Sequence, residues 1–330
     1  MTSRPLHALT RRSALAALAA FTVSMPAFAA DPFPSKEIRF IVPWNAGGSN
    51  DIAARALAEI LMKDGIRVIV DNQPGATGSI GMQKVATAAP DGYTIGMGTS
   101  STLALIAQGL TTLRNDQFAP IARVTLDPLT LLVPTASPNG TLESFVDHVK
   151  KNPGKVSIGT PGSNNLNHIF AVMTGRAAGT DVIAVPYTGG SKVIADLAGK
   201  QIEAAVLKPS ESKAQIDGGL VKPIGVFANE RLKVFPDVPT FKEKGYDVFP
   251  YGPLVQMAYL VAPAKVPEDV RVKLTKLFQE AIQSAEFKAV AAQGGALVDD
   301  VTGPALATEI AGVEKSLAIV GKQIFVAEKK

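Results

Sequence analysis

The chain has 330 residues, a formal net charge of +4 and no cysteine. Without cysteine it can form neither a disulfide bond nor a thiolate site, and its nearly balanced charges argue against a nucleic-acid-binding face, which needs clustered Lys and Arg. Its length is enough for about two domains with large cores.

The first 29 residues have the pattern of an export signal. Arg11-Arg12 precedes an apolar stretch over residues 14–23, and Ala27-Phe28-Ala29 fits a signal-peptidase site. The apolar stretch is shorter than the roughly 20 residues of a membrane-spanning helix. The residues after Arg12 fit the general secretory route better than the twin-arginine route. We therefore expect residues 1–29 to be removed by cleavage near Ala29, and the mature protein to lie in the periplasm with almost no net charge.

From residue 38 onward, apolar stretches of strand type alternate with helical patterns. This alternation predicts an α/β fold in which mostly parallel sheets carry helices on both faces. The expected strands cover residues 38–42, 66–70, 94–97, 129–133, 155–159, 181–185 and 204–207. The expected helices cover residues 52–62, 80–88 and 143–151, with further helices that begin near Leu103, Leu166, Val193, Pro267 and Pro304.

Two segments are expected to carry the chain between two lobes. The first is Asp127-Pro128, and the second is the stretch 245–253, whose Pro and Gly content is typical of a hinge. Two crossings make one lobe discontinuous. We therefore predict lobe 1 over residues 30–127 plus 254–330, with the C-terminal helices returning to it, and lobe 2 over residues 128–253.

A Gly-rich turn between the first strand and the first helix is the most informative motif. Pro43 ends the strand, Gly47 and Gly48 let a ligand approach the backbone, and the residues after them can cap the helix. An anion placed there meets free N–H groups and the positive end of the helix dipole. The turn lacks the Lys-Ser/Thr ending of a P-loop and the third glycine of a dinucleotide-binding motif. The candidate ligand-binding residues of this segment are Trp44, Asn45, Gly47, Gly48, Ser49 and Asp51.

Polar loops also follow several later strands. The carboxyl ends of strands in an open α/β sheet border a crevice where ligands bind, so we expect these loops to meet there. The candidate residues that they supply are Thr99, Ser100, Ser163, Asn164, Asn165, Tyr187, Thr188, Gly189 and Lys208.

Several candidates also have a structural explanation. Thr99 and Ser100 either contact the ligand or cap the next helix. Asp51 either faces the helix dipole or accepts a hydrogen bond from the ligand. Trp44, the only tryptophan, either lines the crevice or packs in the core, and Tyr187 is expected to pack under its loop with its hydroxyl toward the crevice.

No set of residues predicts catalysis, a metal site or a cofactor. The two histidines outside the export signal, His148 and His168, have no second metal ligand three or four residues away, and we expect both on helix surfaces. No serine lies in a Gly-x-Ser-x-Gly motif. We therefore predict a binding protein that is not an enzyme and uses no cofactor.

Five motifs in a fixed order make the chain similar to a known family. They are Ile41-Val42-Pro43 with Gly47-Gly48-x-x-Asp51, Asp71-Asn72-Gln73-Pro74-Gly75, Ala89-Pro90-Asp91-Gly92-Tyr93, Val185-Pro186-Tyr187 and Phe235-Pro236-Asp237-Val238-Pro239. Over nearly all of its mature length the chain resembles the Bug-type extracytoplasmic solute receptors of tripartite tricarboxylate transporters. The resemblance implies a two-lobed periplasmic-binding-protein fold of the clamshell type (type II), which binds a small organic carboxylate between its lobes.

The resemblance also implies partners and ligand contacts. The receptor would act as a monomer and deliver its ligand to the membrane subunits of such a transporter, and presentation of the ligand to a membrane sensor kinase is the alternative. The residues that match those around the family's ligand carboxylate are Gly47, Gly48, Ser163, Asn164, Tyr187 and Gly189.

Two positions depart from the family pattern. Asn164-Asn165 stands where relatives often carry histidines, and Lys208 stands where many carry an aspartate or asparagine. Lys208 either pairs with a second acidic group of the ligand or packs its stem at the lobe surface with its ammonium in water.

Overall fold

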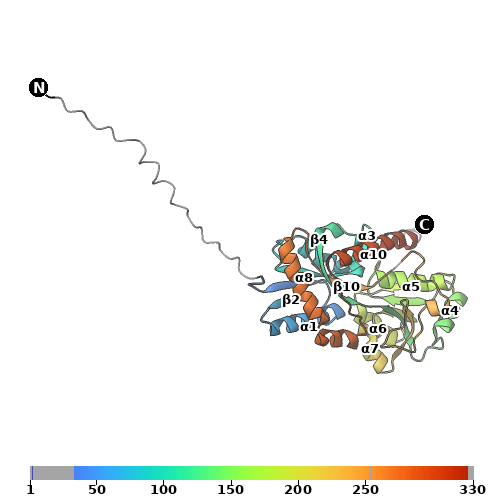
Figure 1. Cartoon of the computed structure of the whole chain (residues 1–330). Coiled ribbons are helices and arrows are strands. Elements are labelled where there is room, and N and C mark those ends of the chain that lie inside the picture. Colours follow the sequence, from blue (N-terminus) through green and yellow to red (C-terminus); the bar gives the residue numbers. More distant parts are fainter. Residues whose placement is uncertain (1, 3–32, 253, 326–330) are drawn as a thin grey trace. The chain divides into compact units, whose positions relative to one another are not determined.

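The computed structural model describes residue 2, residues 33–252 and residues 254–325 (Figure 1). Apart from residue 2, the expected export signal and its cleavage site lie outside the described residues. The chain divides into a unit over Met1–Ser35 and a unit over Lys36–Lys330. Every helix and strand given below belongs to the second unit.

The first sheet has five strands in the order β2-β1-β3-β10-β4. β1 (Ile38–Val42) pairs in parallel with β2 (Val68–Asn72) and β3 (Thr94–Thr99). β10 (Met257–Pro263) joins from far along the chain and pairs antiparallel with β3 and with β4 (Phe118–Leu126). This sheet therefore combines residues from two distant parts of the sequence.

The second sheet has five strands in the order β7-β6-β8-β5-β9. β6 (Ser157–Thr160) pairs in parallel with β7 (Ile183–Pro186) and β8 (Ala204–Leu207). β5 (Leu129–Pro134) pairs antiparallel with β8 and with β9 (Val221–Phe227). The second sheet thus repeats the pattern of the first.

Both sheets are mixed: four of the five strands in each sheet run in the same direction, and one runs against them. In each sheet one strand, β10 or β5, runs against its two neighbours. These are the two strands that the chain enters when it passes from one sheet to the other. The cavity described below lies at the ends of five other strands, namely β1, β3, β6, β7 and β8. The chain enters β5 and β10 from that same side. These two strands therefore begin there and run in the opposite direction.

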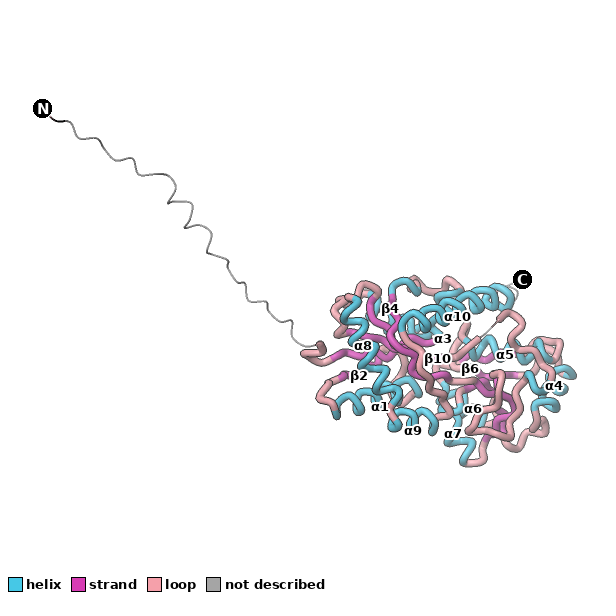
Figure 2. Tube along the Cα trace, in the orientation of Figure 1, coloured by secondary structure: helices cyan, strands magenta, loops and turns pink. Residues whose placement is uncertain are grey.

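Ten α-helices flank the two sheets in the described part of the chain (Figure 2). Within this part, none of the helices combines the length and the apolar composition that a membrane span requires. The helices are α1 (Ser49–Lys63), α2 (Ser79–Ala86), α3 (Ser100–Ala107), α4 (Leu142–Lys151), α5 (Leu166–Ala177), α6 (Gly190–Ala198), α7 (Pro209–Asp217), α8 (Glu268–Gln283), α9 (Ala285–Gln293) and α10 (Gly303–Ile324). Among the residues that the structure describes, three 3-10 helices cover Ala76–Gly78, Asn115–Gln117 and Lys242–Lys244.

Burial of one helix face holds the helices on the sheets. In α4, Leu142, Phe145 and Val149 recur at a spacing of three to four residues and are all buried. Thr141 Oγ1 accepts the Ser144 N–H at 3.2 Å and caps the start of this helix. Apolar spacing and a capping residue together explain why this segment forms a helix and which face it buries.

The C-terminal helices pack on the first sheet. α8 and α10 both contact β4, and α10 also contacts α3. The ring of Phe278 in α8 meets that of Phe40 in β1 edge-on, with 6.2 Å between the ring centroids. The C-terminal helices therefore pack on the same sheet that contains β1, the first strand of the chain.

Candidate ligand-binding site

A cavity of about 470 Å³, called the main cavity below, lies where loops from both sheets meet. These loops follow β1, β3, β6, β7 and β8, and Gln256, just before β10, completes the lining. The lining residues are Trp44, Asn45, Ala46, Gly47, Gly48, Ser49, Asn50, Ile52, Thr99, Ser101, Pro161, Asn165, Asn167, Thr188, Gly189, Gly190, Ser191, Lys208, Ser210, Glu211 and Gln256.

The N-cap residues of five helices line the main cavity. They are Gly48 of α1, Thr99 of α3, Asn165 of α5, Gly189 of α6 and Lys208 of α7. The first turn of each helix has N–H groups without a partner inside the helix, and the helix dipole makes that end positive. Each end stabilises a nearby anion by about 0.3–1 kcal/mol. Five such ends around one space suit the binding of a carboxylate.

Asp51 holds the loop after β1 in shape. The Gly47 N–H donates to Asp51 Oδ2 at 2.8 Å, and Arg55 Nε donates to the same oxygen at 3.0 Å. Burial alone would raise the pKa of Asp51, but the hydrogen bonds from Arg55 and Gly47 hold this pKa below its ordinary value. Asp51 is buried and does not line the main cavity, and its hydrogen bonds position the loop after β1.

Trp44 lines the main cavity with a half-buried indole. The Trp44 carbonyl accepts Asn72 Nδ2 at 3.1 Å, which ties the loop to the end of β2. Its Nε1 is buried and has no hydrogen-bond partner among the described residues. A buried N–H without a partner costs about 1–3 kcal/mol. Trp44 therefore contributes to the cavity wall, while its N–H stays buried without a partner among the described residues.

Thr99 and Ser100 have different roles. Thr99 Oγ1 accepts the Thr102 N–H at 3.4 Å, so Thr99 caps α3, and it also lines the main cavity. Ser100 Oγ donates to the Val255 carbonyl at 2.6 Å and accepts the Met257 N–H at 3.1 Å. Ser100 is fully buried and does not line the cavity, so it fastens α3 to the segment that leads into β10.

The loop after β6 presents one of its three candidates to the main cavity. Asn165 lines it, and its Oδ1 accepts the His168 N–H at 3.0 Å. Ser163 and Asn164 do not line it. The Asn164 carbonyl instead accepts Gln108 Nε2, at the end of α3, at 2.8 Å. The backbone of Asn164 has a φ of 55°, which is in the left-handed region. The sequence alone does not reveal this conformation.

The loop after β7 presents Thr188 and Gly189 to the main cavity, but not Tyr187. The Tyr187 ring packs near Gly159 of β6: a Cβ added to this glycine would lie 3.3 Å from the ring. Burial raises the pKa of Tyr187, and a hydrogen bond to Asp196 raises it further. The Tyr187 hydroxyl therefore bonds to Asp196 in α6. It was expected to reach the crevice, but Tyr187 does not line the main cavity.

His148 and His168 both make contacts that support the fold. Asn164 donates its N–H to His168 Nδ1 at 3.1 Å, burial lowers the pKa of His168, and its ring lies 4.7 Å from that of Phe325. His168 is thus half-buried, which corrects the surface position expected for it. His148 Nε2 lies 2.8 Å from Glu203 Oε2. Among the residues that the structure describes, no three His, Cys, Asp or Glu side chains come together as metal ligands do.

Lys208 lines the main cavity and is buried, so its ammonium does not extend into bulk water. Its Nζ lies 3.3 Å from Asp127 Oδ2 and donates to Ser49 Oγ at 3.2 Å. Thr125 Oγ1 donates to the same Asp127 oxygen at 2.9 Å. The side chain at the end of β8 therefore bridges to α1 and to the segment between β4 and β5. Neither alternative expected from sequence included this internal ion pair.

Two functional candidates were missed by the sequence reasoning. Glu211 lines the main cavity, and its Oε2 accepts the Lys208 N–H at 3.1 Å. Burial raises the pKa of Glu211. The proline at the first position of α7 and the glutamate at the third are recognisable helix-start signals, and they could have placed Glu211 beside Lys208. Gln256 lies before a strand that was not expected, and no sequence signal marks it.

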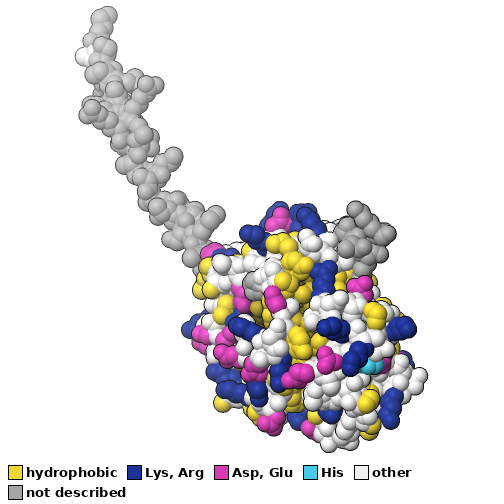
Figure 3. Space-filling model, turned by 90° about the vertical axis from the view of Figure 1, so that its right-hand side faces the viewer, with side chains coloured by type: hydrophobic (Ala, Val, Ile, Leu, Met, Phe, Trp, Pro, Cys, Tyr) yellow, Lys and Arg dark blue, Asp and Glu magenta, His cyan; other side chains and the backbone are white. Residues whose placement is uncertain are grey.

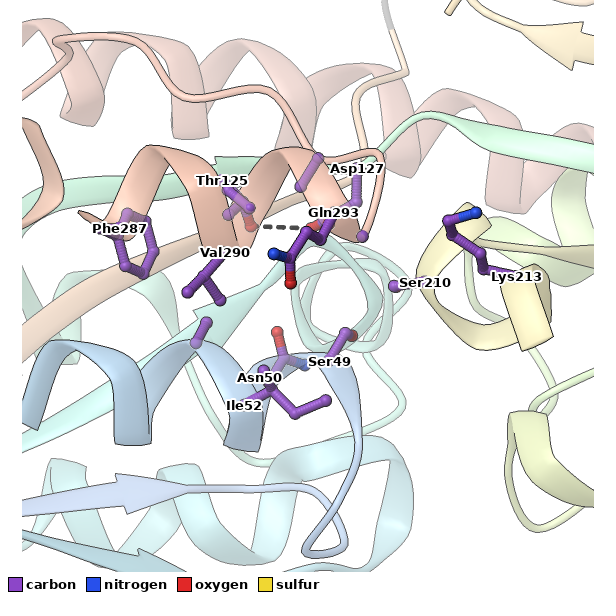
Figure 4. Close-up of a pocket in the computed structure, with 14 residues that line it drawn as sticks. Ser49, Asn50, Ile52, Thr125, Asp127, Ser210, Lys213, Phe287, Val290 and Gln293 are labelled. Carbon is purple, nitrogen blue, oxygen red and sulfur yellow. Dashed lines mark hydrogen bonds between the residues drawn. The ribbon is translucent and has the colours of Figure 1, made fainter. Parts of the chain in front are cut away.

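A smaller space of about 220 Å³, called the side pocket, adjoins the main cavity (Figure 4). Figure 4 shows it between α1, with Asn50 and Ile52, and α9, with Phe287 and Val290. The two spaces share Ser49, Asn50, Ile52 and Ser210. The side pocket is therefore a largely apolar extension next to the Lys208–Asp127 pair.

The surface gives no sign of a single-sign charged face on the side displayed in Figure 3. Lys and Arg side chains alternate there with Asp and Glu side chains, and hydrophobic side chains gather toward the middle. This distribution agrees with the nearly balanced composition of the chain.

The sequence and the fold both match known proteins. The model of the tripartite tricarboxylate transporter family receptor matches residues 52–306. A UPF0065 protein of Bordetella pertussis is 32% identical over 287 residues, which cover 86% of this chain and 87% of that protein. The solved structure of the periplasmic binding protein BugD is 29% identical with a TM-score of 0.76, over 88% of this chain and 98% of that one. MatC from Rhodopseudomonas palustris, solved with bound malate, is 27% identical with a TM-score of 0.78, over 87% of this chain and 99% of that one.

Proposed function

Because the chain belongs to the receptor family of tripartite tricarboxylate transporters, we propose that it is a periplasmic receptor that captures a small organic carboxylate. Members of this family are solute-binding receptors and not enzymes, and the two-lobed α/β class expected from sequence is confirmed. The malate bound to MatC is itself a carboxylate.

The convergence of five helix N-termini on the main cavity is the observation that carries the proposal. Gly48 and Thr99 belong to the first sheet's helices, whereas Asn165 and Gly189 belong to those of the second. Backbone N–H groups and hydroxyls at such ends satisfy a carboxylate without an arginine. The ligand-contacting residues that we propose are Trp44, Asn45, Gly47, Gly48, Ser49, Thr99, Asn165, Thr188, Gly189 and Lys208.

The same arrangement suggests how binding is reported. A carboxylate that contacts donors from both sheets stabilises the arrangement in which they lie close together, through its higher affinity for that state. We propose that the membrane subunits of a transporter recognise this closed, monomeric receptor and accept the ligand from it. We also propose lobe 1 over residues 30–127 plus 254–330, lobe 2 over residues 128–253, and export by a signal cleaved near Ala29.

A thermal-shift screen followed by calorimetry tests carboxylate binding. We expect at least one mono-, di- or tricarboxylate to stabilise the protein, by about 2.7 kcal/mol at 100 times its Kd. Gly189 has an extended backbone and open space around an added Cβ, so Gly189→Val should fold and narrow the main cavity. Affinity should fall at least tenfold in Gly189→Val and stay unchanged in the control Gly312→Val, which lies in α10 with equally open space.

Uptake by cells tests the delivery step. A strain that lacks this receptor should lose uptake of the acid identified by calorimetry, and the wild-type gene should restore it where Gly189→Val does not. Unchanged uptake in the deletion strain would contradict delivery to a transporter, while leaving the binding result intact.

A further inference from the structure

The stretch between β2 and α2 has a left-handed backbone over four consecutive residues. Their φ values are 131°, 46°, 50° and 87°, and the residues are Gly75, Ala76, Thr77 and Gly78. Alanine and threonine rarely adopt this region, because the Cβ crowds the following carbonyl oxygen. Such a conformation persists only where the surrounding structure holds it, and it is common near functional sites. The motif over residues 71–75 leads directly into this stretch, and the function proposed above gives it no role.

A buried side chain of α3 holds the left-handed residues. Thr102 is 3% exposed, and its Oγ1 donates to the Thr77 carbonyl at 3.0 Å. An added Cβ on Gly78 would lie 2.5 Å from the same Oγ1, so α3 leaves room only for glycine at this position. The Gly78 N–H in turn donates to the Gly75 carbonyl at 3.0 Å. The stretch is therefore fixed both by α3 and by its own turn.

The same part of the chain packs against Trp44. An added Cβ on Gly78 would lie 3.4 Å from Trp44 Cζ2, on the ring edge that also carries the buried Nε1. An added Cβ on Gly81, in the first turn of α2, would lie 2.7 Å from Pro43 Cβ. Asn72 Nδ2 donates to the Trp44 carbonyl at 3.1 Å. The indole ring, the carbonyl and the preceding proline of Trp44 are thus all held by residues 72–81.

We propose that residues 72–81 and Thr102 position the Trp44 indole, and so set the shape of the main cavity without contacting the ligand. All of these residues are described by the structure, and none of them lines the main cavity, whereas Trp44 does. Thr102 and Gly81 are therefore positioning residues that act on the ligand through Trp44. The effect on affinity rests on the proposed carboxylate-binding function, but the position of the indole can be measured without a ligand.

The emission of Trp44, the only tryptophan, reports the position of the indole directly. Thr102→Val keeps a branched side chain but removes the donor to the Thr77 carbonyl, so the left-handed stretch should relax away from the indole. We expect the emission of the ligand-free protein to shift, and acrylamide to quench it more strongly than in the wild type. Thr102→Ser keeps the hydroxyl and should keep the wild-type emission.

Thr174→Val is the matched control for the loss of a buried hydroxyl. Thr174 is fully buried in α5, its Oγ1 donates to the Phe170 carbonyl at 2.8 Å, and it does not line the main cavity. Its loss should therefore leave the emission of Trp44 unchanged. An equal shift in Thr174→Val would overturn the proposal, because it would mean that any loosening of the protein moves the indole.

Gly81→Ala tests the same support from the opposite side. Thr102 Oγ1 also lies 3.3 Å from Thr99 Oγ1, and Thr99 lines the main cavity, so a variant that does not involve Thr99 is needed. The new Cβ must displace Pro43, and Trp44 should move with it. Gly312→Ala, in α10 with open space around an added Cβ, is the control and should leave the emission unchanged.

Calorimetry then relates the indole to the ligand. The probes are succinate, malate and citrate, and the tightest of them should bind about three- to tenfold more weakly to Thr102→Val and Gly81→Ala. The three control variants should keep the wild-type Kd. Unchanged emission in both folded variants would overturn the positioning role, and changed emission with an unchanged Kd would overturn its link to the cavity. If no acid stabilises the wild type, the carboxylate function falls, while the emission still decides whether these residues position Trp44.

Discussion

The two walls of the main cavity handle charge in different ways. The wall from the first sheet has uncharged residues, with Trp44, Gly47, Gly48 and Ser49 around the start of α1. The wall from the second sheet carries Lys208 and Glu211: Glu211 accepts the Lys208 N–H, and the Lys208 ammonium pairs with Asp127. Helix ends serve any carboxylate, whereas fixed charges discriminate among ligands. We infer that the first wall anchors the ligand and the second selects it.

The largest effect is expected where the second wall's ion pair is broken. Lys208→Met leaves the Asp127 carboxylate buried without its cation, and removal of one partner of a buried pair costs about 3–5 kcal/mol. We therefore expect the free energy of unfolding, measured by urea denaturation, to fall by about that amount. The double variant Lys208→Met/Asp127→Asn should recover most of the loss, because no buried charge then lacks a partner.

The matched control for this variant lies in α7, the helix that Lys208 precedes. Lys213 pairs with Asp217 at the surface of α7, and exposed pairs contribute about 0–1 kcal/mol. Lys213→Met should therefore change stability little. A loss below about 1 kcal/mol in Lys208→Met would show that Asp127 finds other partners and that the pair is not what fixes the second wall.

The two walls also differ in how far the sequence predicts them. The first wall contains five residues that were candidates for the crevice and that all line the main cavity: Trp44, Asn45, Gly47, Gly48 and Ser49. A Gly-rich turn between a strand and a helix exposes its backbone whatever the rest of the fold does, so local sequence suffices to locate it. Whether these residues bind the ligand stays a prediction.

The second wall depends on contacts that sequence does not contain. Lys208 was expected either to meet the ligand or to reach water, because its partner Asp127 lies on another element. Tyr187 was expected to reach the crevice, but Asp196 engages its hydroxyl. The fold shows the same limit. The α/β class followed from alternating patterns, whereas the antiparallel placement of β5 and β10 follows from the path of the chain between sheets.

A smaller loss of stability is expected when the first wall loses its internal support. Asp51→Asn removes the charge that accepts from Gly47 and Arg55, and hydrogen bonds to charged groups contribute about 1.5–3 kcal/mol. We expect a loss near 2 kcal/mol at neutral pH. Because the pKa of Asp51 is lowered in the folded state, this stabilisation is present above the unfolded pKa of about 4 and disappears as pH falls through the folded value.

Denaturation at several pH values measures that dependence. The wild type and Asp51→Asn should converge in stability as the pH is lowered below about 4. A stability difference that is independent of pH would mean that shape, and not charge, explains the role of Asp51.

A tenfold loss of ligand affinity, equal to about 1.4 kcal/mol, is expected when the N-terminus of α1 in the first wall is obstructed. Gly48 has a backbone that other residues adopt, and an added Cβ would lie 3.2 Å from the Asn45 carbonyl oxygen. Gly48→Val should therefore fold with a small local adjustment and narrow the approach to the N-terminus of α1. Calorimetry with the tightest probe acid measures the change, and an unaltered Kd in a folded variant would remove this loop from the ligand site.

The smallest effect concerns the spectrum of Trp44. It is the only tryptophan, and it lines a space that a ligand would fill. A ligand that excludes water from the indole should shift or quench the emission excited near 295 nm, roughly the red edge of tryptophan absorption. The half-saturation point of the spectral change should equal the Kd from calorimetry. An unchanged spectrum at saturation would leave the anchoring role to the helix ends alone.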